Sequence, residues 1–165
     1  AVAGSSARIA PPRPCGSAIR SGIMAEAEEV PPGPQIDVSR IELSPAGECP
    51  FEEALGLVME FSTDTMLADH CWRLSYAVDT SKRRKIIDLG ATEVVSYAPG
   101  AHVMSFSAPS FDGALVPDDV KSQMNGMLSA VLVGPSGEET MTVNMVTQVC
   151  VRDGVLVRYI FNPLE

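Results

Sequence analysis

Apolar residues recur at every second position along most of the chain after residue 35, and this alternation restricts the possible folds more than any other feature. Successive side chains of a β-strand point to opposite faces, so a period of two predicts strands with one buried face. One further segment, Met127 to Val133, is a more continuous apolar run that also fits a strand. The alternating segments are 36–43, 55–61, 72–78, 104–106, 141–145 and 155–161.

Glycine and proline clusters separate these segments at positions 44–47, 99–100, 109–113, 134–137 and 153–154. The best candidate for a helical turn is 117–123, where Pro117 is followed by Asp118 and Asp119. Seven or eight short strands joined by such turns predict an all-β fold, an antiparallel immunoglobulin-like β-sandwich over residues 35–165. Cysteines and tryptophan do not stand at the antibody spacing, so a true antibody domain is excluded.

The first 34 residues differ from the rest because they hold six of the thirteen prolines. Such a composition cannot bury enough apolar surface to offset the entropy of ordering it, so we expect a disordered segment over 1–34. Met24, followed by Ala25 and then Glu26, is the expected start of translation, with residues 1–23 as upstream sequence.

The chain is acidic, with 12 Lys and Arg against 21 Asp and Glu and a formal charge of −9. A surface that binds duplex nucleic acid needs an excess of cations, so a general nucleic-acid binder is not expected. No apolar run reaches the ~18 residues that a membrane-spanning helix requires, so no membrane partner is expected either. These features favour a nuclear or cytoplasmic protein.

Motifs for catalysis or metal binding are missing from the sequence. The four cysteines form no Cys-x-x-Cys pair, and His70 and His102 lie far apart, so we expect free thiols and no metal site. Asp69 and His70 are adjacent, but neighbours on a strand point to opposite faces and would not pair in a catalytic triad. We therefore predict a monomeric, non-enzymatic domain without catalytic residues or cofactors that binds another protein.

Several segments between Ile36 and Phe161, above all 72–76 and 99–106, together resemble the anti-silencing function family of histone chaperones. Residues 72–76, Trp-Arg-Leu-Ser-Tyr, are similar to that family's Trp-Lys-Ile-Ile-Tyr, and Met59-Glu60-Phe61 is similar to its Ile-Thr-Phe. Residues 99–106, Pro-Gly-Ala-His-Val-Met-Ser-Phe, resemble its Pro-Ala-Gly-x-His-x-Phe-x-Phe. The spacing from Trp72 to His102 fits without a gap. The resemblance implies an elongated immunoglobulin-like core, core histones as partners and a role in chromatin assembly.

The resemblance also implies a set of partner-binding residues, at positions that depart from the family. The family's acidic loop is replaced by four cations, and its histone-contacting acid falls at Ile86, with Asp88 two residues beyond. Thr142 and Val146 stand where the family has Arg and Tyr, and its apolar contact falls near Leu128, within a residue or so, beside Met127. The resulting candidate residues are Lys82, Arg83, Arg84, Lys85, Asp88, Met127, Leu128, Thr142, Val146 and Arg158.

Two other functions remain open at this point. The cationic stretch 82–85 would suit an adaptor for an acidic or neutral partner, although it could also be a solvated loop or a nuclear-localisation patch. A sandwich that encloses an acyl or prenyl chain between its sheets is the remaining alternative, because Met and Val residues could line a pocket as well as fill a core.

Overall fold

The computed structural model describes residues 33–79, 84–111 and 124–165 of the chain. The segment predicted to be disordered, 1–34, lies outside this description except for its last two residues, and so does the helical turn predicted at 117–123. The strands are β1 (Ile36–Ser44), β2 (Cys49–Pro50), β3 (Leu55–Thr63), β4 (Leu67–Asp79), β5 (Arg84–Ala91), β6 (Val95–Tyr97), β7 (Gly100–Ala108), β8 (Met124–Val133), β9 (Glu139–Arg152) and β10 (Val155–Ile160).

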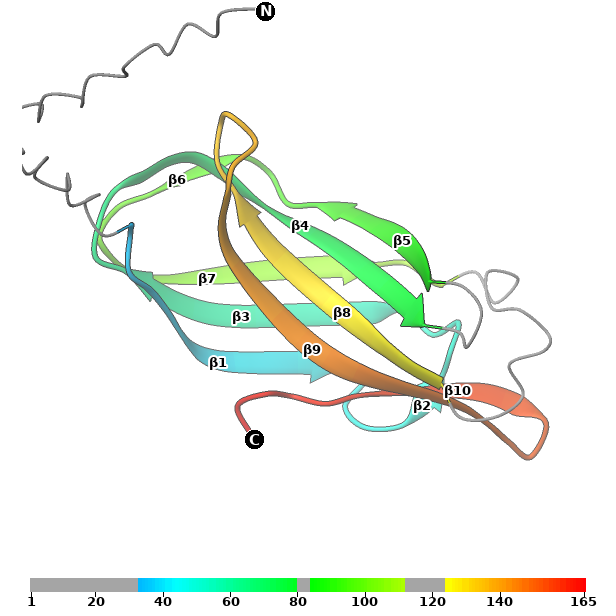
Figure 1. Cartoon of the computed structure of the whole chain (residues 1–165). Coiled ribbons are helices and arrows are strands. Elements are labelled where there is room, and N and C mark those ends of the chain that lie inside the picture. Colours follow the sequence, from blue (N-terminus) through cyan, green and yellow to red (C-terminus); the bar gives the residue numbers. More distant parts are fainter. Residues whose placement is uncertain (1–32, 80–83, 112–123) are drawn as a thin grey trace, which may run out of the picture. The chain divides into compact units, whose positions relative to one another are not determined.

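The strands form two antiparallel sheets, which confirms the predicted all-β sandwich (Figure 1). One sheet has three strands in the order β1-β3-β7. The other has seven, in the order β2-β10-β9-β8-β4-β5, with β6 pairing to the start of β4. In Figure 1, β8 and β9 lie in front of β1 and β3, so the viewer looks onto the outer face of the seven-stranded sheet.

The core lies between the two sheets and follows the alternation of the sequence. Along β3 every second residue from Leu55 to Thr63 is buried, while the residues between them are partly exposed. Trp72, in the centre of β4, is fully buried and packs its ring edge-on against Phe61 of β3, with the ring centres 5.3 Å apart. Aromatic pairs of this kind add to the area burial that holds two sheets together.

Three of the strands, β2, β5 and β6, were not predicted, because none of them has a clear alternating pattern in the sequence. β2 and β6 are only two and three residues long, too short for a periodic pattern. β5 lies at the edge of its sheet, starts with the cations Arg84 and Lys85 and is largely exposed. The prediction of a loop over 82–85 is therefore wrong for Arg84 and Lys85, because both belong to β5.

Other expectations concern helices and thiols. Among the described residues, no helix is long and apolar enough to cross a membrane.

Cys49, Cys71 and Cys150 are free thiols, as predicted, and Cys15 lies outside the described residues. Burial raises the pKa of the Cys49 thiol above its usual value, which keeps it protonated and unreactive at neutral pH.

Candidate protein-binding surface

The outer face of the seven-stranded sheet carries a row of apolar side chains that runs across four strands. Residues directly opposite each other on neighbouring strands share a face of the sheet. Ala77 of β4 is opposite Ile86 of β5 on one side and Met127 of β8 on the other. Met127 is in turn opposite Val146 of β9. We call these four residues, Ile86, Ala77, Met127 and Val146, the apolar row.

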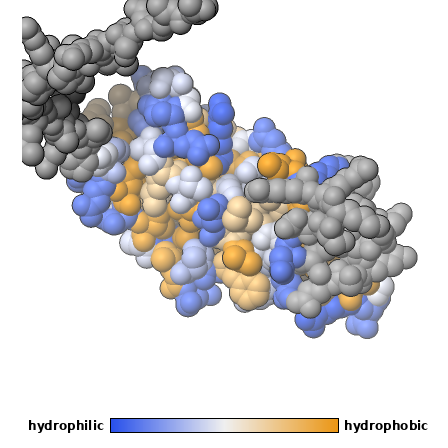
Figure 2. Space-filling view, viewed as in Figure 1, coloured by the Kyte–Doolittle hydropathy of each residue, from blue (hydrophilic) through white to orange (hydrophobic). Residues whose placement is uncertain are grey.

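The two ends of the apolar row are open to solvent. Ile86 is 62% exposed and Val146 is 57% exposed, whereas Ala77 is buried and Met127 half-buried between them. The row extends further at the β9 end, because the backbone N–H of the exposed Phe161 donates to the carbonyl of Val146 at 2.9 Å. Figure 2 shows this side of the molecule, where hydrophobic residues lie among hydrophilic ones at the surface.

Polar rows border the apolar row on the side toward the β8–β9 turn. The next row consists of Asp88, Ser75, Ser129 and Asn144, and the Ser129 hydroxyl donates to the Asn144 side-chain oxygen at 2.8 Å. Beyond it, Arg73, Val131 and Thr142 form a third row. A hollow of about 330 Å³ opens here, with Arg73, Ile86, Asp88 and Glu139 among its lining residues. The surface therefore offers apolar contact, hydrogen-bonding groups and charges of both signs within a small area.

The structure brings four of the predicted site residues together on this face. Met127 and Val146 belong to the apolar row, Asp88 to the first polar row and Thr142 to the second. Asp88, Thr142 and Val146 are exposed. These positions come from three different strands, so their proximity depends on the register of the sheet.

Leu128 and Arg158, two further predicted site residues, lie in the core instead of on the surface. Leu128 is 0% exposed and Arg158 is 1% exposed. The guanidinium of Arg158 donates hydrogen bonds to the carbonyl oxygens of Phe51, Glu53 (2.6 Å) and Ala54 (3.2 Å), and it stacks over the Phe111 ring at 4.3 Å from the ring centre. These two residues are therefore excluded from the candidate surface.

The buried side chain of Arg158 links two segments of the chain through hydrogen bonds. A buried guanidinium needs several acceptors to replace its lost hydration, and the three carbonyls of the segment between β2 and β3 supply them. Burial lowers the pKa of Arg158, with Cys49 and Tyr76 acting in the opposite direction. Arg158 thus fastens β10 to the chain segment that leads into the other sheet.

The predicted cationic residues 82–85 are described only in part. Lys82 and Arg83 lie outside the described residues, and for Arg84 only the backbone is described. Lys85 is exposed and stands opposite Val78, a core residue, so it belongs to the set of β5 positions that alternates with Ile86 and Asp88. Lys85 is therefore not a member of the apolar row.

Sequence reasoning did not select Ile86, Ala77, Arg73 or Phe161 as surface residues. A signal was available for Ile86, because it alternates with Asp88 and would share a face with it on any strand. The alternation over 72–78 also places Arg73 and Ala77 on the outward side of their strand, but it does not say which residues of other strands lie beside them. Those neighbours follow from the pairing of β4 with β5 and β8.

The histidines and their neighbours are engaged in structural contacts. The ring of His70 meets the Ala68 carbonyl at 2.8 Å and the Thr140 hydroxyl at 3.1 Å, while the backbone N–H of Asp69 donates to the Ser96 hydroxyl. His102 Nε2 lies 2.6 Å from the Ala98 carbonyl. Among the described residues, no group of three or more His, Cys, Asp or Glu side chains could hold a metal ion.

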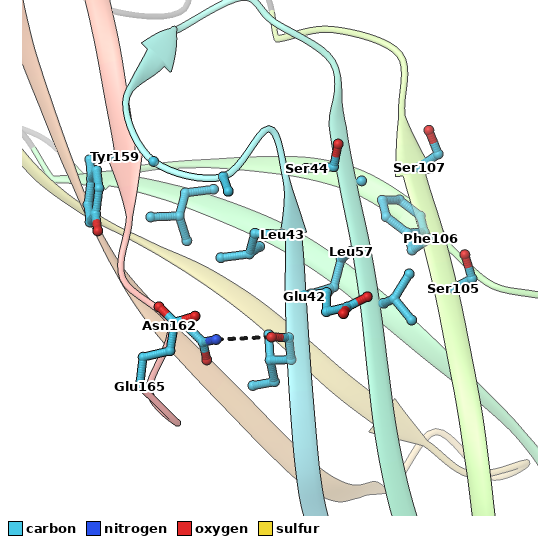
Figure 3. Close-up of a pocket in the computed structure, with 16 residues that line it drawn as sticks. Glu42, Leu43, Ser44, Leu57, Ser105, Phe106, Ser107, Tyr159, Asn162 and Glu165 are labelled. Atoms are coloured by element: carbon cyan, nitrogen blue, oxygen red, sulfur yellow. Dashed lines mark hydrogen bonds between the residues drawn. The ribbon is translucent and has the colours of Figure 1, made fainter.

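A second hollow lies at β1, β3, β7 and the end of β10 (Figure 3). Its volume is about 510 Å³, and hydrophilic residues such as Glu42, Ser44, Ser105 and Asn162 lie in its lining beside Leu43 and Phe106. The Asn162 side chain donates to the Ile41 carbonyl at 2.9 Å and holds the C-terminal residues against β1. This mixed lining lacks the enclosing apolar wall that a long acyl or prenyl chain needs.

No family model matches this chain, and no curated protein matches it.

Proposed function

We propose that this chain is a non-enzymatic protein-binding domain that uses the outer face of its seven-stranded sheet, with core histones as the leading candidate partner. The observation that carries the proposal is the apolar row, which places Ile86, Ala77, Met127 and Val146 next to one another on the outer face of the sheet and leaves both of its ends open to solvent. Contiguous apolar surface with a polar rim is typical of protein interaction sites.

The direction of the row favours a helical partner. Four strands at ~4.8 Å spacing give the row a length of about 14 Å across the sheet. An α-helix rises 1.5 Å per residue, so about ten residues, or three turns, would follow the row with apolar side chains at positions i, i+3, i+7 and i+10. Such a helix would lie across the strands, and its polar flanks would meet Ser75, Ser129 and Asn144.

Charges near the row support the resemblance to the histone chaperones in two places. The family's acid falls at Ile86, and Asp88 lies one strand period further along the same face of β5. The family's Arg is replaced by Thr142, but Arg73 belongs to the same cross-strand row as Thr142 and is exposed. An acid and an arginine are therefore both available on this face to meet a partner's charged groups.

The net charge also favours a basic partner. A formal charge of −9 raises the rate at which a positively charged protein encounters this chain, because long-range attraction steers association. Core histones are basic proteins with long helices. The cations at 82–85 act against this preference locally, which is why the charge on that stretch is worth testing directly.

The decisive experiment is a titration of purified core histone dimer with the full chain in about 150 mM salt. We expect saturable one-to-one binding with a Kd at or below about a micromolar. Val146→Asp, which buries a charge under the partner, should weaken binding at least about tenfold. Val155→Asp is the matched control, because Val155 is also an exposed valine of this sheet but lies at the β9–β10 hairpin. Absence of saturable binding up to about 50 µM would exclude histones as the partner.

Replacement of Lys82, Arg83, Arg84 and Lys85 by Glu distinguishes the adaptor alternative. If the partner is a basic histone, the four substitutions remove repulsion and should tighten binding, by a few tenths of a kcal/mol per charge at low salt. If the partner is acidic, the same variant should lose binding together with its salt dependence. An unchanged affinity would show that this stretch contacts neither kind of partner.

A further inference from the structure

β7 is an edge strand whose second side is not paired with any strand among the described residues. Its register with β3 runs without interruption from Leu55 opposite Ala108 to Thr63 opposite Gly100. The inward-facing His102 and Phe106 remain half-exposed, whereas the inward-facing residues of β3 are all buried. Among the described residues no strand is paired to this side of β7, although β5 comes near it where the Phe106 ring lies beside Gly90. An edge strand of this kind presents backbone N–H and C=O groups that can pair with a further strand.

β1 and β5 are also edge strands, and both have features that disfavour pairing with a further strand. β1 has an irregularity between Val38 and Arg40, carries charged residues, and is contacted at the Ile41 carbonyl by Asn162. β5 carries Lys85 and Asp88, and its pairing is irregular where Gly90 has a positive φ of 112°. β7 has neither a bulge nor a charged residue, and its Val103 is 65% exposed on the outer face. Natural edge strands without such protection tend to pair with another chain.

We infer that β7 pairs with β7 of a second copy of this chain, antiparallel across a two-fold axis at Val103. The strand is self-complementary, because the absence of charged residues means that no like charges come to lie opposite each other. The two exposed Val103 side chains would face each other, and Ala101 of each copy would face the small Ser105 of the other. The two three-stranded sheets would become one continuous sheet of six strands.

The acidity of the chain does not prevent this arrangement. The nearest acid on the adjoining strand is Glu60, which is opposite Val103 on β3. Two Glu60 residues would stand three strand spacings apart, about 14 Å, which exceeds the ~8 Å Debye length at physiological salt. In the dimer the open side of each β7 is paired with the other β7. No third copy can add at this strand, so assembly stops at a closed dimer.

The dimer should be weak, because one pair of short strands buries less area than a standard interface. Sedimentation velocity of the full chain between about 10 and 500 µM should show the average mass rising from 17.5 kDa toward twice that value, with half-dimerisation at roughly 100 µM. Val103→Lys places two cations at the axis and should raise the dimer dissociation constant at least about tenfold. Val155→Lys, the same change at another exposed valine, should leave it unaltered.

A cross-linking experiment tests the predicted axis independently of solubility or folding of the lysine variant. Directly opposed residues of an antiparallel pair have Cβ atoms about 4.5 to 5.5 Å apart, so Val103→Cys should form a disulfide-linked dimer under mild oxidation. The native chain and Val155→Cys serve as controls for the existing thiols, and neither should cross-link at a comparable rate.

Two results would overturn the inference: a mass that stays at 17.5 kDa up to about 500 µM, or a dimer that survives Val103→Lys unchanged. This surface belongs to the three-stranded sheet and the apolar row to the seven-stranded sheet, so the dimer can fail while partner binding holds, and the reverse. The inference also replaces the monomer expected from the sequence.

Discussion

The two sheets share one core but expose very different outer faces. On the three-stranded sheet, Arg40 forms ion pairs with Glu42 and Glu60, and the outward positions of β7 are Ala101, Val103, Ser105 and Ser107, of which Val103 is the one large apolar side chain. On the seven-stranded sheet, the corresponding central positions are the apolar row. Both sheets turn one side toward the core, so the alternation that fixes the fold does not distinguish their outer faces. In the proposed function, the residues at the outward positions make that distinction.

Because of this contrast, we expect substitutions on the two outer faces to affect partner binding differently. Substitutions at the exposed outward positions should change stability little on either sheet, because these side chains touch water in the native and unfolded states alike. Only those on the seven-stranded sheet should change partner binding. Residues between the sheets should support both faces at once, so truncation of a core side chain should destabilise the whole domain.

The largest effect is expected from Trp72→Ala. The side chain is fully buried against Phe61, so its removal loses a large transfer free energy and leaves a cavity. We expect the free energy of unfolding to fall by roughly 3 to 5 kcal/mol, measured by chemical denaturation. Trp72→Phe retains most of the ring volume and should recover much of that loss. A change below about 1 kcal/mol for the alanine variant would mean that Trp72 does not support the core.

Arg158→Met should have the next largest effect. Methionine fills a similar volume but leaves the carbonyls of Phe51, Glu53 and Ala54 without their donor. Since buried acceptors without a partner are costly, we expect a loss of roughly 2 to 3 kcal/mol in the free energy of unfolding. Arg152→Met is the matched control, because Arg152 forms an exposed ion pair with Glu48 on the same sheet. Equal effects for the two variants would contradict a structural role for Arg158.

The fold could be predicted from sequence because the alternation is strong in the central strands. β3 and β4 alternate with large apolar residues on one side, and a period of two admits only strands. Segments without that pattern were missed. β5 is one of them, since it lies at the edge of its sheet and is largely exposed. A strand in that position does not need a regular alternation of apolar and polar residues.

The outward direction of a candidate site residue could be predicted from the sequence where its strand has a clear alternation. Thr142 and Val146 alternate with the buried Val143 and Met145, so their outward direction follows from the pattern. β8 is apolar at nearly every position, and a continuous run does not say which of Met127 and Leu128 faces outward. The structure resolves this, because Leu128 is opposite Tyr76 and Met145 in the core.

Arg158 was misplaced for a different reason. A charged residue in a strand is ordinarily exposed, because burial of an unpaired guanidinium is costly. Its acceptors come from a segment more than a hundred residues earlier in the chain, and only the folded sheet brings them together. No local pattern contains that information.

The pH dependence of stability tests the core alone, through the buried Tyr76. We expect a smaller change in the free energy of unfolding than for the core substitutions above. Burial raises the pKa of the Tyr76 phenol above its usual value of 10.0. The folded state then holds this proton at pH values where the unfolded state releases it, so stability is retained below about pH 10 and falls as the pH rises further. Denaturation between pH 8 and 11 should show a shallower loss for Tyr76→Phe than for the native chain.

The smallest effect is expected from Arg40→Ala on the ion-paired face. Arg40 and its partners Glu42 and Glu60 are each about half exposed, with side-chain exposures of 59%, 53% and 43%. Water and salt screen such pairs, so their removal should change the free energy of unfolding by no more than about 0.5 kcal/mol. That loss should shrink further in about 1 M salt, where the Debye length is near 3 Å. Histone titration of the same variant should give the native affinity, because Arg40 lies on the three-stranded sheet. A loss of affinity equal to that of Val146→Asp would instead place the partner on the ion-paired face and reverse the assignment of the two faces.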